Sequence, residues 1–355
     1  MRKYYTRACN FYYGRAARNL IQSKRAFSLN GKKDIAFDKI EIFIREKGRV
    51  KSSLIYCKDI KKLKKNIKKI VKRDIKKITS KRKNFLKNVN FSEPSIMGVL
   101  NLTPDSFSDG GQFNKKNKSF KHISNMIHSG AEIVDVGGES TRPGSKTINT
   151  ETEWKRVSNV IKKFKKKYKK ICLSIDTRKS ELMVKSIKCG ADLINDVSGF
   201  NYDKNSLSKI KKYNIAKVLH HMKGTPNTMQ KNPTYKNVLL DIYDFFEKEI
   251  NKHQKKYSSK IILDPGIGFG KNLKHNLMLI NKISIFHSLG FPILIGTSRK
   301  RFIENIVSNF DTKERLGGTL SSVLFLYSQG IKFFRVHNVE EVKQGLLVFE
   351  SLLNK

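Results

Sequence analysis

The 355-residue sequence is poor in acidic residues, in cysteine and in long apolar runs, and each shortage narrows its possible class. Its four cysteines, Cys9, Cys57, Cys172 and Cys189, form no CxxC pair and no zinc-binding spacing, which indicates free thiols in a reducing compartment. No stretch approaches the ~20 apolar residues that span a bilayer. The basic start lacks the apolar segment and cleavage site of a secretory signal. We therefore expect a cytoplasmic protein.

Positive charge is in excess, because 73 Lys and Arg stand against 30 Asp and Glu, a formal net charge of +43. Residues 1–90 alone carry 29 Lys and Arg against 6 Asp and Glu. Such a surface attracts polyanions, so nucleic-acid or membrane contact through residues 1–90 is one interpretation. We favour a general bias toward lysine, because no nucleic-acid-binding motif accompanies the charge.

Residues 1–92 are predicted to form a small basic α+β extension, whose role is unknown. Residues 36–56 alternate like a short hairpin around Lys47 and Gly48. Residues 58–89 place apolar side chains such as Ile67, Ile75 and Ile78 at helical spacing, with Lys and Arg on the other face. This part contains no recognisable set of catalytic residues.

From residue 93 onward, apolar strands alternate regularly with amphipathic helices. The predicted strands are 95–100, 132–137, 171–176, 192–197, 216–221, 261–264, 292–296 and 331–336. Eight strand–helix repeats over ~260 residues suit a (β/α)8 barrel, so residues 93–355 are predicted to form an α/β domain of the TIM-barrel class. A doubly wound sheet fits less well, because no GxGxxG follows the first strand.

Every predicted strand ends in polar or charged residues. In chain order these are Asn101, Asp135 with Glu139, Asp176, Asn195 with Asp196, His221, Asp264, Ser298-Arg299-Lys300, and Arg335 with His337. In a barrel these ends meet at one mouth, and unpaired buried charges are costly there. The pattern therefore indicates an active site. Because Ser298 has no neighbouring histidine, we expect substrate positioning and not covalent catalysis.

The polar residues of the mouth divide into two chemical groups. The first combines donors and acceptors that would read the edge of a flat polar heterocycle, namely Asp176, Asn195, Asp264 and Lys300. The second supplies cations and neutral polar groups, namely Asn101, Thr141, Arg142, Arg335 and His337. This second group fits a phosphate or diphosphate, with Mg²⁺ bridging through a hard oxygen ligand.

Eight stretches resemble, in order and spacing, motifs of the bacterial dihydropteroate synthase family. They are GVLNLTPDSFSDGG (98–111), EIVDVGGESTRPGS (132–145), SIDT (174–177), LINDVSG (193–199), HMKGTPNTMQ (221–230), LDPGIGFGKNLKHN (263–276), GTSRKRFI (296–303) and FRVHNV (334–339). The resemblance implies a Mg²⁺-dependent transferase of folate biosynthesis. Such an enzyme joins 4-aminobenzoate to (7,8-dihydropterin-6-yl)methyl diphosphate, giving 7,8-dihydropteroate and diphosphate.

The resemblance also implies roles for individual residues. Substrate binding falls to Thr141, Arg142, Asp176, Asn195, Met222, Asp264, Phe269, Lys300, Arg335 and His337. Catalysis falls to Asp105, Lys300, Arg335 and His337, and the metal ligand is Asn101. Phe269 and Lys300 would flank the 4-aminobenzoate pocket, and Met222 would lie beside the pterin.

Residues 102–112 match a loop that is expected to fold over the site together with residues 139–149. Closure would exclude water from the positive character that develops at the pterin methylene as diphosphate leaves. Asp105 would offset that charge, and Phe107 and Pro143 would wall the 4-aminobenzoate ring.

Other positions carry smaller expectations. Asp135 is expected to order the mouth, and Asp196 could bind substrate or only support its strand. One of His220 and His221 is expected to point outward, and His275 to help start a helix.

One alternative activity shares the pterin-reading acids, that of a corrinoid-linked methyltetrahydrofolate methyltransferase of the same superfamily. It would not need Arg142, Arg335 and His337 for a diphosphate. Members of the synthase family commonly dimerise through late helices, so a homodimer is expected, and sulfonamides, which mimic 4-aminobenzoate, should compete for the site. Arg301, where many members carry serine, could meet the aminobenzoate carboxylate or point away.

Overall fold

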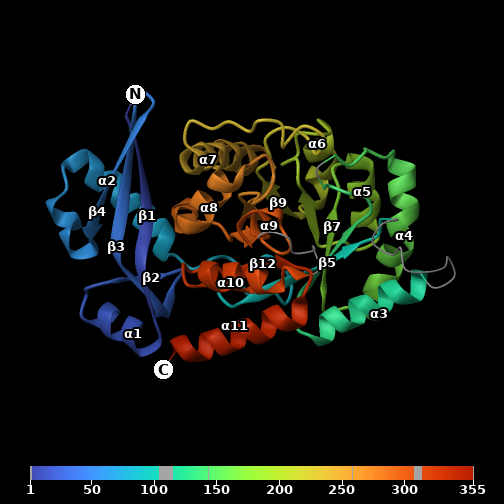
Figure 1. Ribbon diagram of the computed structural model, residues 1–355, viewed down its shortest axis with the longest axis horizontal. Helices are drawn as coiled ribbons and strands as arrows, with labels where there is room; N and C mark the ends of the chain where they lie inside the picture. Colours follow the sequence, from blue (N-terminus) through green and yellow to red (C-terminus); the bar gives the residue numbers. More distant parts are fainter. Residues whose placement is uncertain (1, 104–114, 143, 258, 308–313, 355) are drawn as a thin grey trace.

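The computed structural model describes residues 2–103, 115–142, 144–257, 259–307 and 314–354, and its larger part is a barrel of parallel strands (Figure 1). The strands are β5 (Ser95–Asn101), β6 (Ile133–Gly137), β7 (Cys172–Asp176), β8 (Leu193–Asp196), β9 (Ala216–His220), β10 (Ile261–Asp264), β11 (Leu294–Ile295) and β12 (Phe333–Val336). They pair in the order β10-β9-β8-β7-β6-β5-β12-β11. A bridge between Leu263 and Ile293 joins the two end strands. The predicted TIM barrel is confirmed.

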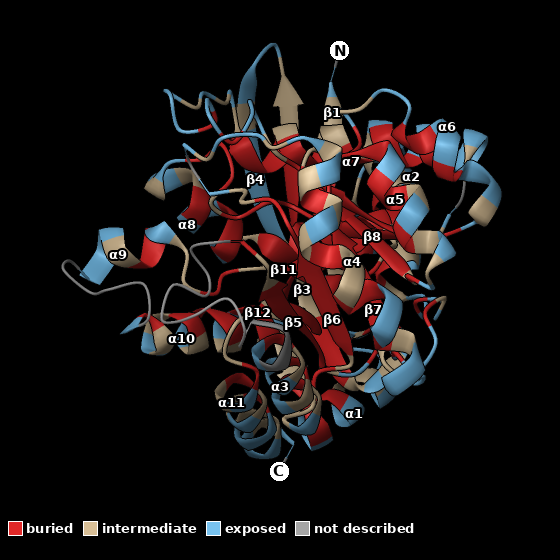
Figure 2. Cartoon of the chain, turned by 90° about the vertical axis from the view of Figure 1, so that its right-hand side faces the viewer, coloured by how far each residue is buried: buried red, intermediate tan, exposed pale blue. Residues whose placement is uncertain are grey.

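The barrel strands are short apolar runs buried on both faces, as Figure 2 shows in red. Burial on both sides suits a parallel sheet that is covered by helices. The helices that follow the strands are α3 (Lys115–His128), α4 (Thr150–Lys167), α5 (Ser180–Lys188), α6 (Ser206–Ile210), α7 (Val238–Lys256), α8 (Leu273–Asn281), α9 (Arg301–Val307), α10 (Leu316–Tyr327) and α11 (Val339–Leu353). The barrel part also contains the 3₁₀ helices η4 (Lys211–Tyr213) and η5 (Ile283–Leu289). No helix among the described residues is long and apolar enough to cross a membrane.

Local signals fix where the helices begin. The Asn149 side chain accepts from the Thr152 amide (2.8 Å) at the start of α4. At the start of α8, Asn272 accepts from the His275 amide (2.8 Å), and the His275 ring accepts from the Asn272 amide. Such reciprocal caps satisfy amide groups that a helix leaves unpaired, and the expected role of His275 is confirmed.

The N-terminal extension is a separate four-stranded sheet with helices around it. Its elements are β1 (Lys3–Tyr13), α1 (Gly14–Gln22), β2 (Phe27–Leu29), β3 (Lys32–Glu46), β4 (Arg49–Tyr56), the 3₁₀ helix η1 (Cys57–Lys62) and α2 (Lys65–Thr79). The predicted hairpin is confirmed, because β3 and β4 pair around Lys47 and Gly48, both with positive φ. The helical pattern over 58–89 is only partly right, since the α-helix covers 65–79.

The extension lies against the outside of the barrel (Figure 1), where β1 and α2 pack on η5. Lys3 pairs with Asp244 of α7 (2.6 Å), and the Tyr13 hydroxyl donates to the Tyr327 carbonyl (2.7 Å). Lys282 pairs with Glu41 of β3 (2.7 Å). Charged, polar and apolar contacts therefore all fix the extension on this side of the barrel.

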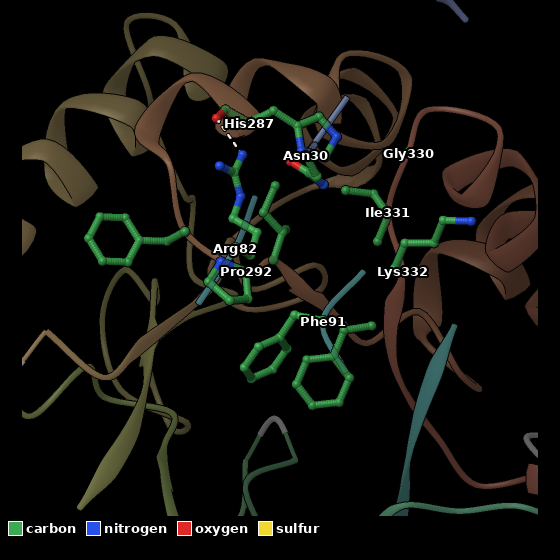
Figure 3. A pocket seen from close by; sticks show the side chains of 11 residues that line it. Asn30, Arg82, Phe91, His287, Pro292, Gly330, Ile331 and Lys332 are labelled. Carbon is green, nitrogen blue, oxygen red and sulfur yellow. Dashed lines mark hydrogen bonds between the residues drawn. The ribbon is translucent and has the colours of Figure 1, made fainter. Parts of the chain in front are cut away.

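Residues 80–94 leave the helix because they close the base of the barrel. Leu86, Val89 and Phe91 are buried against side chains at the amino ends of the strands, among them Met97 and Phe333. A cavity of about 10 Å³ lies beside this plug, lined by residues such as Asn30, Arg82 and His287 (Figure 3). It sits at the end of the barrel opposite the polar strand ends, so it is not the predicted substrate site.

Candidate active site

Three polar strand ends and one glycine lie in one row across β5 to β8. Asn101 pairs in register with Gly137, Gly137 with Asp176, and Asp176 with Asn195. A side chain at Gly137 would bring its Cβ 3.4 Å from that of Asp176 and 3.7 Å from Asn101 Oδ1. The glycine therefore leaves space at the mouth between Asn101 and Asp176.

Arg335 of β12 connects two acids of the mouth. Its Nε donates to Asp135 Oδ2 (2.7 Å) and its Nη2 to Asp176 Oδ2 (3.0 Å). Asp135 also accepts from Asn195 Nδ2 (3.0 Å) and from Ser174 Oγ (2.6 Å), and it is fully buried. Burial opposes the charge of Arg335, but Asp135 and Asp176 raise its pKa above the ordinary value. Asp135 thus orders the mouth, as expected.

The other titratable groups of the mouth are shifted by burial. Burial raises the pKa of the Asp176 carboxyl and that of Asp264 above the usual range, against the opposing effect of Arg335. Burial, with the nearby Arg335, lowers the pKa of Lys300 below its usual value. Asn195 Oδ1 is buried and finds no hydrogen-bond donor among the described residues. Shifted groups with an open acceptor are typical of a ligand-binding site.

The loop after β10 depends on a glycine and a buried lysine. Gly266 has φ +66° and its Cβ would lie 2.0 Å from the His221 carbonyl oxygen, so only glycine fits. Its amide donates to Asp264 Oδ1 (2.7 Å). Lys271 Nζ donates to the carbonyls of Phe269 (2.8 Å) and Gly266 (2.9 Å), and burial lowers its pKa to about 7. The Gly266 amide therefore holds Asp264, and Lys271 holds the loop that carries Gly266.

An apolar wall borders this loop. Met222 packs with the buried side chains of Val197, Met229 and Phe269. Lys300 Nζ lies 4.0 Å from the centroid of the Phe269 ring, a distance typical of a cation–π contact. The predicted neighbours Met222, Phe269 and Lys300 thus come together on one side of the mouth.

The two histidines after β9 correct one expectation. His220 and His221 are both buried, so the expectation that one points outward is wrong. His220 Nδ1 donates to the Val197 carbonyl (2.8 Å), and its ring meets the Phe269 ring edge to face at 4.7 Å. Burial, with the charge of Lys271, lowers both pKa values well below the usual range. Both rings are therefore neutral supports of the loop.

Ser298 and His337 correct another expectation, because they lie together. Ser298 Oγ is 3.1 Å from His337 Nδ1 and accepts from the His337 amide (3.2 Å). Arg299 has φ +58° and its guanidinium donates to Asn338 Oδ1 (2.8 Å), which turns Lys300 inward. Burial and neighbouring cations, first Arg335, lower the pKa of His337 to about 3. The neutral ring is thus held as a hydrogen-bonding group.

A buried ion network holds the loop after β6, and no local pattern in the sequence predicts it. Arg178 Nη2 pairs with Glu139 Oε2 (2.7 Å). Lys179 Nζ pairs with Glu139 Oε1 (3.0 Å) and Glu153 Oε2 (2.6 Å). The network fixes the segment that carries Thr141, which is half-buried, and Arg142, which is exposed. Arg142 is among the cations that lower the pKa of His337, so it belongs to the same side of the mouth.

The remaining predicted residues are Asp196 and three positions of the two expected loops. Asp196 accepts from the amides of Ser198 (2.7 Å) and Phe200 (3.1 Å), so it supports the turn after β8. Asp105, Phe107 and Pro143 lie outside the described residues, and their roles stay predictions.

Comparisons with known proteins agree with this geometry. The family described as pterin binding enzyme matches residues 97–337. A dihydropteroate synthase of Escherichia coli (strain K12) is 38% identical over 269 residues, which are 75% of this chain and 94% of that protein.

Solved structures of similar proteins cover the same part of the chain. The Yersinia pestis dihydropteroate synthase with a sulfonamide drug complex is similar with a TM-score of 0.71 and 35% identity, over 75% of this chain and 97% of that one. The Xanthomonas albilineans dihydropteroate synthase with 4-aminobenzoic acid has a TM-score of 0.69 and 32% identity, over 74% and 94%. These comparisons favour the synthase over a corrinoid-linked methyltransferase.

Proposed function

The chain belongs to the pterin binding enzyme family, and from its activity as a dihydropteroate synthase we propose how the residues of its mouth share the work. The observation that carries the proposal is the Asp135–Arg335–Asp176 group, which fixes a cation between two acids at the end of the barrel. Beside it, Asn195 Oδ1 is a buried acceptor without a donor among the described residues, and further cations such as Lys300 lie near Arg335. A bicyclic substrate with a diphosphate tail matches that division.

The pterin ring binds between Asp176, Asn195, Asp264 and Lys300. Asn195 Oδ1 supports this, because it is buried without a donor among the described residues while Asn195 Nδ2 is held by Asp135. A ligand N–H satisfies the amide oxygen, and ligand N–H groups that donate to the buried carboxylates favour their ionised form. Lys300 donates to a ring acceptor of the pterin from beside Phe269.

The diphosphate binds to Arg335, His337, Thr141 and Arg142. His337 is neutral, so it donates one N–H to a phosphate oxygen without adding charge. The 4-aminobenzoate nitrogen attacks the pterin methylene, a C–N bond forms, the C–O bond to diphosphate breaks and the nitrogen loses a proton. Arg335 and Arg142 stabilise the anion that leaves. Asp105 is the residue we expect to offset positive charge at the methylene.

Asn101 is the residue that would hold Mg²⁺. Its amide oxygen lies in the row with Asp176, and such a hard oxygen suits this ion. Mg²⁺ keeps several waters and is often bound by one protein oxygen and the substrate phosphates. The described residues contain no group of three or more His, Cys, Asp and Glu side chains that could hold a metal. When bound, the ion supplies positive charge to the leaving diphosphate.

The 4-aminobenzoate ring packs against Phe269 and Lys300 near the lip of the mouth. A structure of the similar Yersinia pestis enzyme is a sulfonamide drug complex, and we expect sulfonamides to compete with 4-aminobenzoate here. Arg301 is exposed at the start of α9, one residue beyond Lys300. Substitution of Arg301 by serine tests whether its side chain contacts the aminobenzoate carboxylate.

The assembly is a homodimer through the late helices. Exposed large apolar side chains gather there, namely Leu277, Met278, Ile306, Val307, Phe325, Leu347, Val348 and Leu352. Phe325 of α10 and Leu347 of α11 belong to helices that pack on each other. A second copy of the chain would cover this face. Light scattering should give a dimer that Phe325→Glu converts to a monomer, and a wild-type monomer would contradict the proposal.

The site of action is the cytoplasm, as its cysteines favour. Cys9, Cys57 and Cys172 are buried free thiols, and Cys189 is also free. Unpaired thiols are typical of a reducing compartment.

One assay tests the reaction. Purified protein is incubated with 4-aminobenzoate, the pterin diphosphate and Mg²⁺, and dihydropteroate and diphosphate are measured together. Equal amounts of the two products are expected. Diphosphate release without dihydropteroate, or methyl transfer from methyltetrahydrofolate, would contradict the assignment, and a chelator that leaves the rate unchanged would contradict the role of Mg²⁺.

A further inference from the structure

The outward side of the N-terminal extension carries a row of lysines that neither the fold nor the reaction uses. Lys65, Lys69, Lys72 and Lys76 of α2 are all exposed. Their positions i, i+4, i+7 and i+11 place them on one face of the helix. At the rise of an α-helix the row is about 16 Å long. The helix lies in the part of the molecule formed by the N-terminal extension, on the side away from α4 (Figure 1).

The apolar face of α2 is already occupied within the protein. Val71, Ile75 and Ile78 are buried, and the helix packs on β1 and η5. Asp74 on the same face is fully buried and accepts from Thr6 Oγ1 (2.9 Å). An interfacial helix binds a membrane by inserting its apolar face. Because that face is not available here, a charged partner in water fits the row better than a lipid surface.

The acids of the extension do not balance the row, because each is engaged elsewhere. Glu41 pairs with Arg7 and Lys282, Glu46 with Arg2, Asp59 with Lys62, Asp74 with Arg73 and Asp34 with Lys32, while Asp38 accepts from Asn10 and Tyr12. In the part of the chain that the structure describes, none of the four row lysines forms an ion pair. Uncompensated positive charge on one face attracts polyanions.

An exposed aromatic ring stands just before η1, the 3₁₀ helix that packs on α2. Tyr56, at the end of the edge strand β4, is 47% exposed. Lys39 Nζ lies 4.7 Å and Lys58 Nζ 5.5 Å from the centroid of its ring. Leu54, two residues earlier, is also exposed. An exposed ring between lysines is a platform on which a nucleic-acid base stacks, and η1 connects it directly to α2.

We propose that this surface binds single-stranded RNA, with the lysines on phosphates and the aromatic ring on a base. The surface, here called the α2–Tyr56 surface, consists of Lys39, Tyr56, Lys58, Lys65, Lys69, Lys72 and Lys76. It lies on the extension, away from the mouth that binds pterin. The synthase would thus be held on RNA while its active site stays open to small substrates.

Helix α4 offers a matched control, since it is also rich in lysine and lies at the other end of the molecule (Figure 1). Lys162, Lys163, Lys166 and Lys167 of α4 are exposed. Replacing four lysines by glutamine on either helix removes the same charge. Unequal effects therefore separate a specific surface from the net charge of the chain.

The experiment measures fluorescence anisotropy of a labelled oligouridine of about 20 nucleotides with the full-length chain. The Lys65→Gln, Lys69→Gln, Lys72→Gln and Lys76→Gln combination should weaken binding by roughly tenfold or more at low salt. It should also reduce the slope of log affinity against log salt by about 3, at about 0.7 per phosphate contact. The α4 combination should change affinity less than about twofold. Synthase turnover, measured alongside, should stay unchanged in both, which shows that both fold.

Tyr56→Ser separates stacking from charge. It should weaken binding by about fivefold or more without changing the salt slope, because a base then loses its stacking partner. The proposal is overturned if wild type does not bind the RNA, or if both lysine combinations weaken binding equally. It is also overturned if vesicles containing phosphatidylserine displace the RNA and bind more tightly.

Discussion

The mouth and the base of the barrel are buried equally and built from opposite chemistry. At the base, Leu86 and Phe91 are 6% and 4% exposed; at the mouth, Asp176 and Asp264 are 7% and 6% exposed. The base uses apolar side chains, which stabilise the fold through burial. The mouth buries charge, which costs stability unless it is paired. The barrel fold does not require buried charge at this end, so the charged residues of the mouth serve ligand binding.

The largest expected effect comes from breaking the charge pairing at the mouth. Arg335→Met leaves Asp135 and Asp176 without their shared cation, so unfolding should become easier by about 3–5 kcal/mol. Turnover per folded molecule should fall on the order of a hundredfold to a thousandfold, because a donor to the leaving anion is lost. Urea unfolding and product formation measure the two effects.

The control is an arginine at the other end. Arg82 at the base is buried and donates to the carbonyls of Lys77 (2.6 Å) and His287 (3.0 Å). Arg82→Met should lower stability by only about 1–3 kcal/mol and leave turnover per folded molecule unchanged. Equal losses of turnover in both variants would contradict the division between the two ends.

The base itself is tested by Phe91→Ala. The change opens a cavity against Phe333 and should lower the free energy of unfolding by about 3–5 kcal/mol. The KM values for both substrates should stay unchanged, because the cavity lies at the far end from the mouth. Thermal unfolding and steady-state kinetics provide the measurements, and a raised KM would show that the two ends are coupled.

A smaller effect of opposite sign is expected for Asp264→Asn. Burial raises the folded pKa of Asp264, so the folded chain holds a proton that the unfolded chain has lost above about pH 4. Wild-type stability therefore falls as pH rises from there through the raised folded value. The variant lacks this contribution and should be at least as stable as wild type at pH 8.

Its pterin affinity should nevertheless fall by roughly tenfold to a hundredfold, since a charged hydrogen-bond acceptor is lost. Urea titrations at pH 5 and pH 8 with calorimetry of pterin binding measure both effects. A variant that is clearly less stable at pH 8 would show that the carboxylate supports the fold.

The smallest effect on stability is expected in the helices that surround the barrel, between its two ends. Asn272→Ala removes the cap of α8 and should lower the free energy of unfolding by about 1 kcal/mol. Turnover should not change. If turnover fell, the glycine-rich loop before α8 would transmit the change to Asp264. Kinetics of Asn149→Ala, which removes the cap of α4, serve as the comparison.

The sequence predicts the barrel and the inventory of the mouth, and physical reasons explain what it does not predict. The apolar runs ending in Asn101, Asp176 and Asp264 predict strands and their polar ends, since burial on both faces leaves a local signature. The plug of Leu86 and Val89 lies in a lysine-rich stretch whose spacing resembles a helix. These side chains are buried because they cover the open base of the barrel, and local spacing does not show that contact.

Contacts between distant residues are invisible to local patterns. Arg178 and Glu139 are 39 positions apart, as are Ser298 and His337, and each pair forms only when neighbouring strand ends meet. The buried Lys271 follows a glycine-rich turn, a context that could have marked it as a cation bound by carbonyl groups. Burial of both His220 and His221 follows from the turn that begins with Gly266.

Because strand β11 is short, the junction between β10 and β11 has few backbone contacts. One bridge, Leu263 to Ile293, joins the two strands, and η5 leads directly into it. Because β1 and α2 of the extension pack on η5, they restrain the segment that leads into this junction. Amide hydrogen exchange at β11 should thus become faster when the contacts of β1 and α2 with η5 are weakened, before exchange in strands β5 to β8 changes. The N-terminal extension can in this way control how often this junction of the barrel opens.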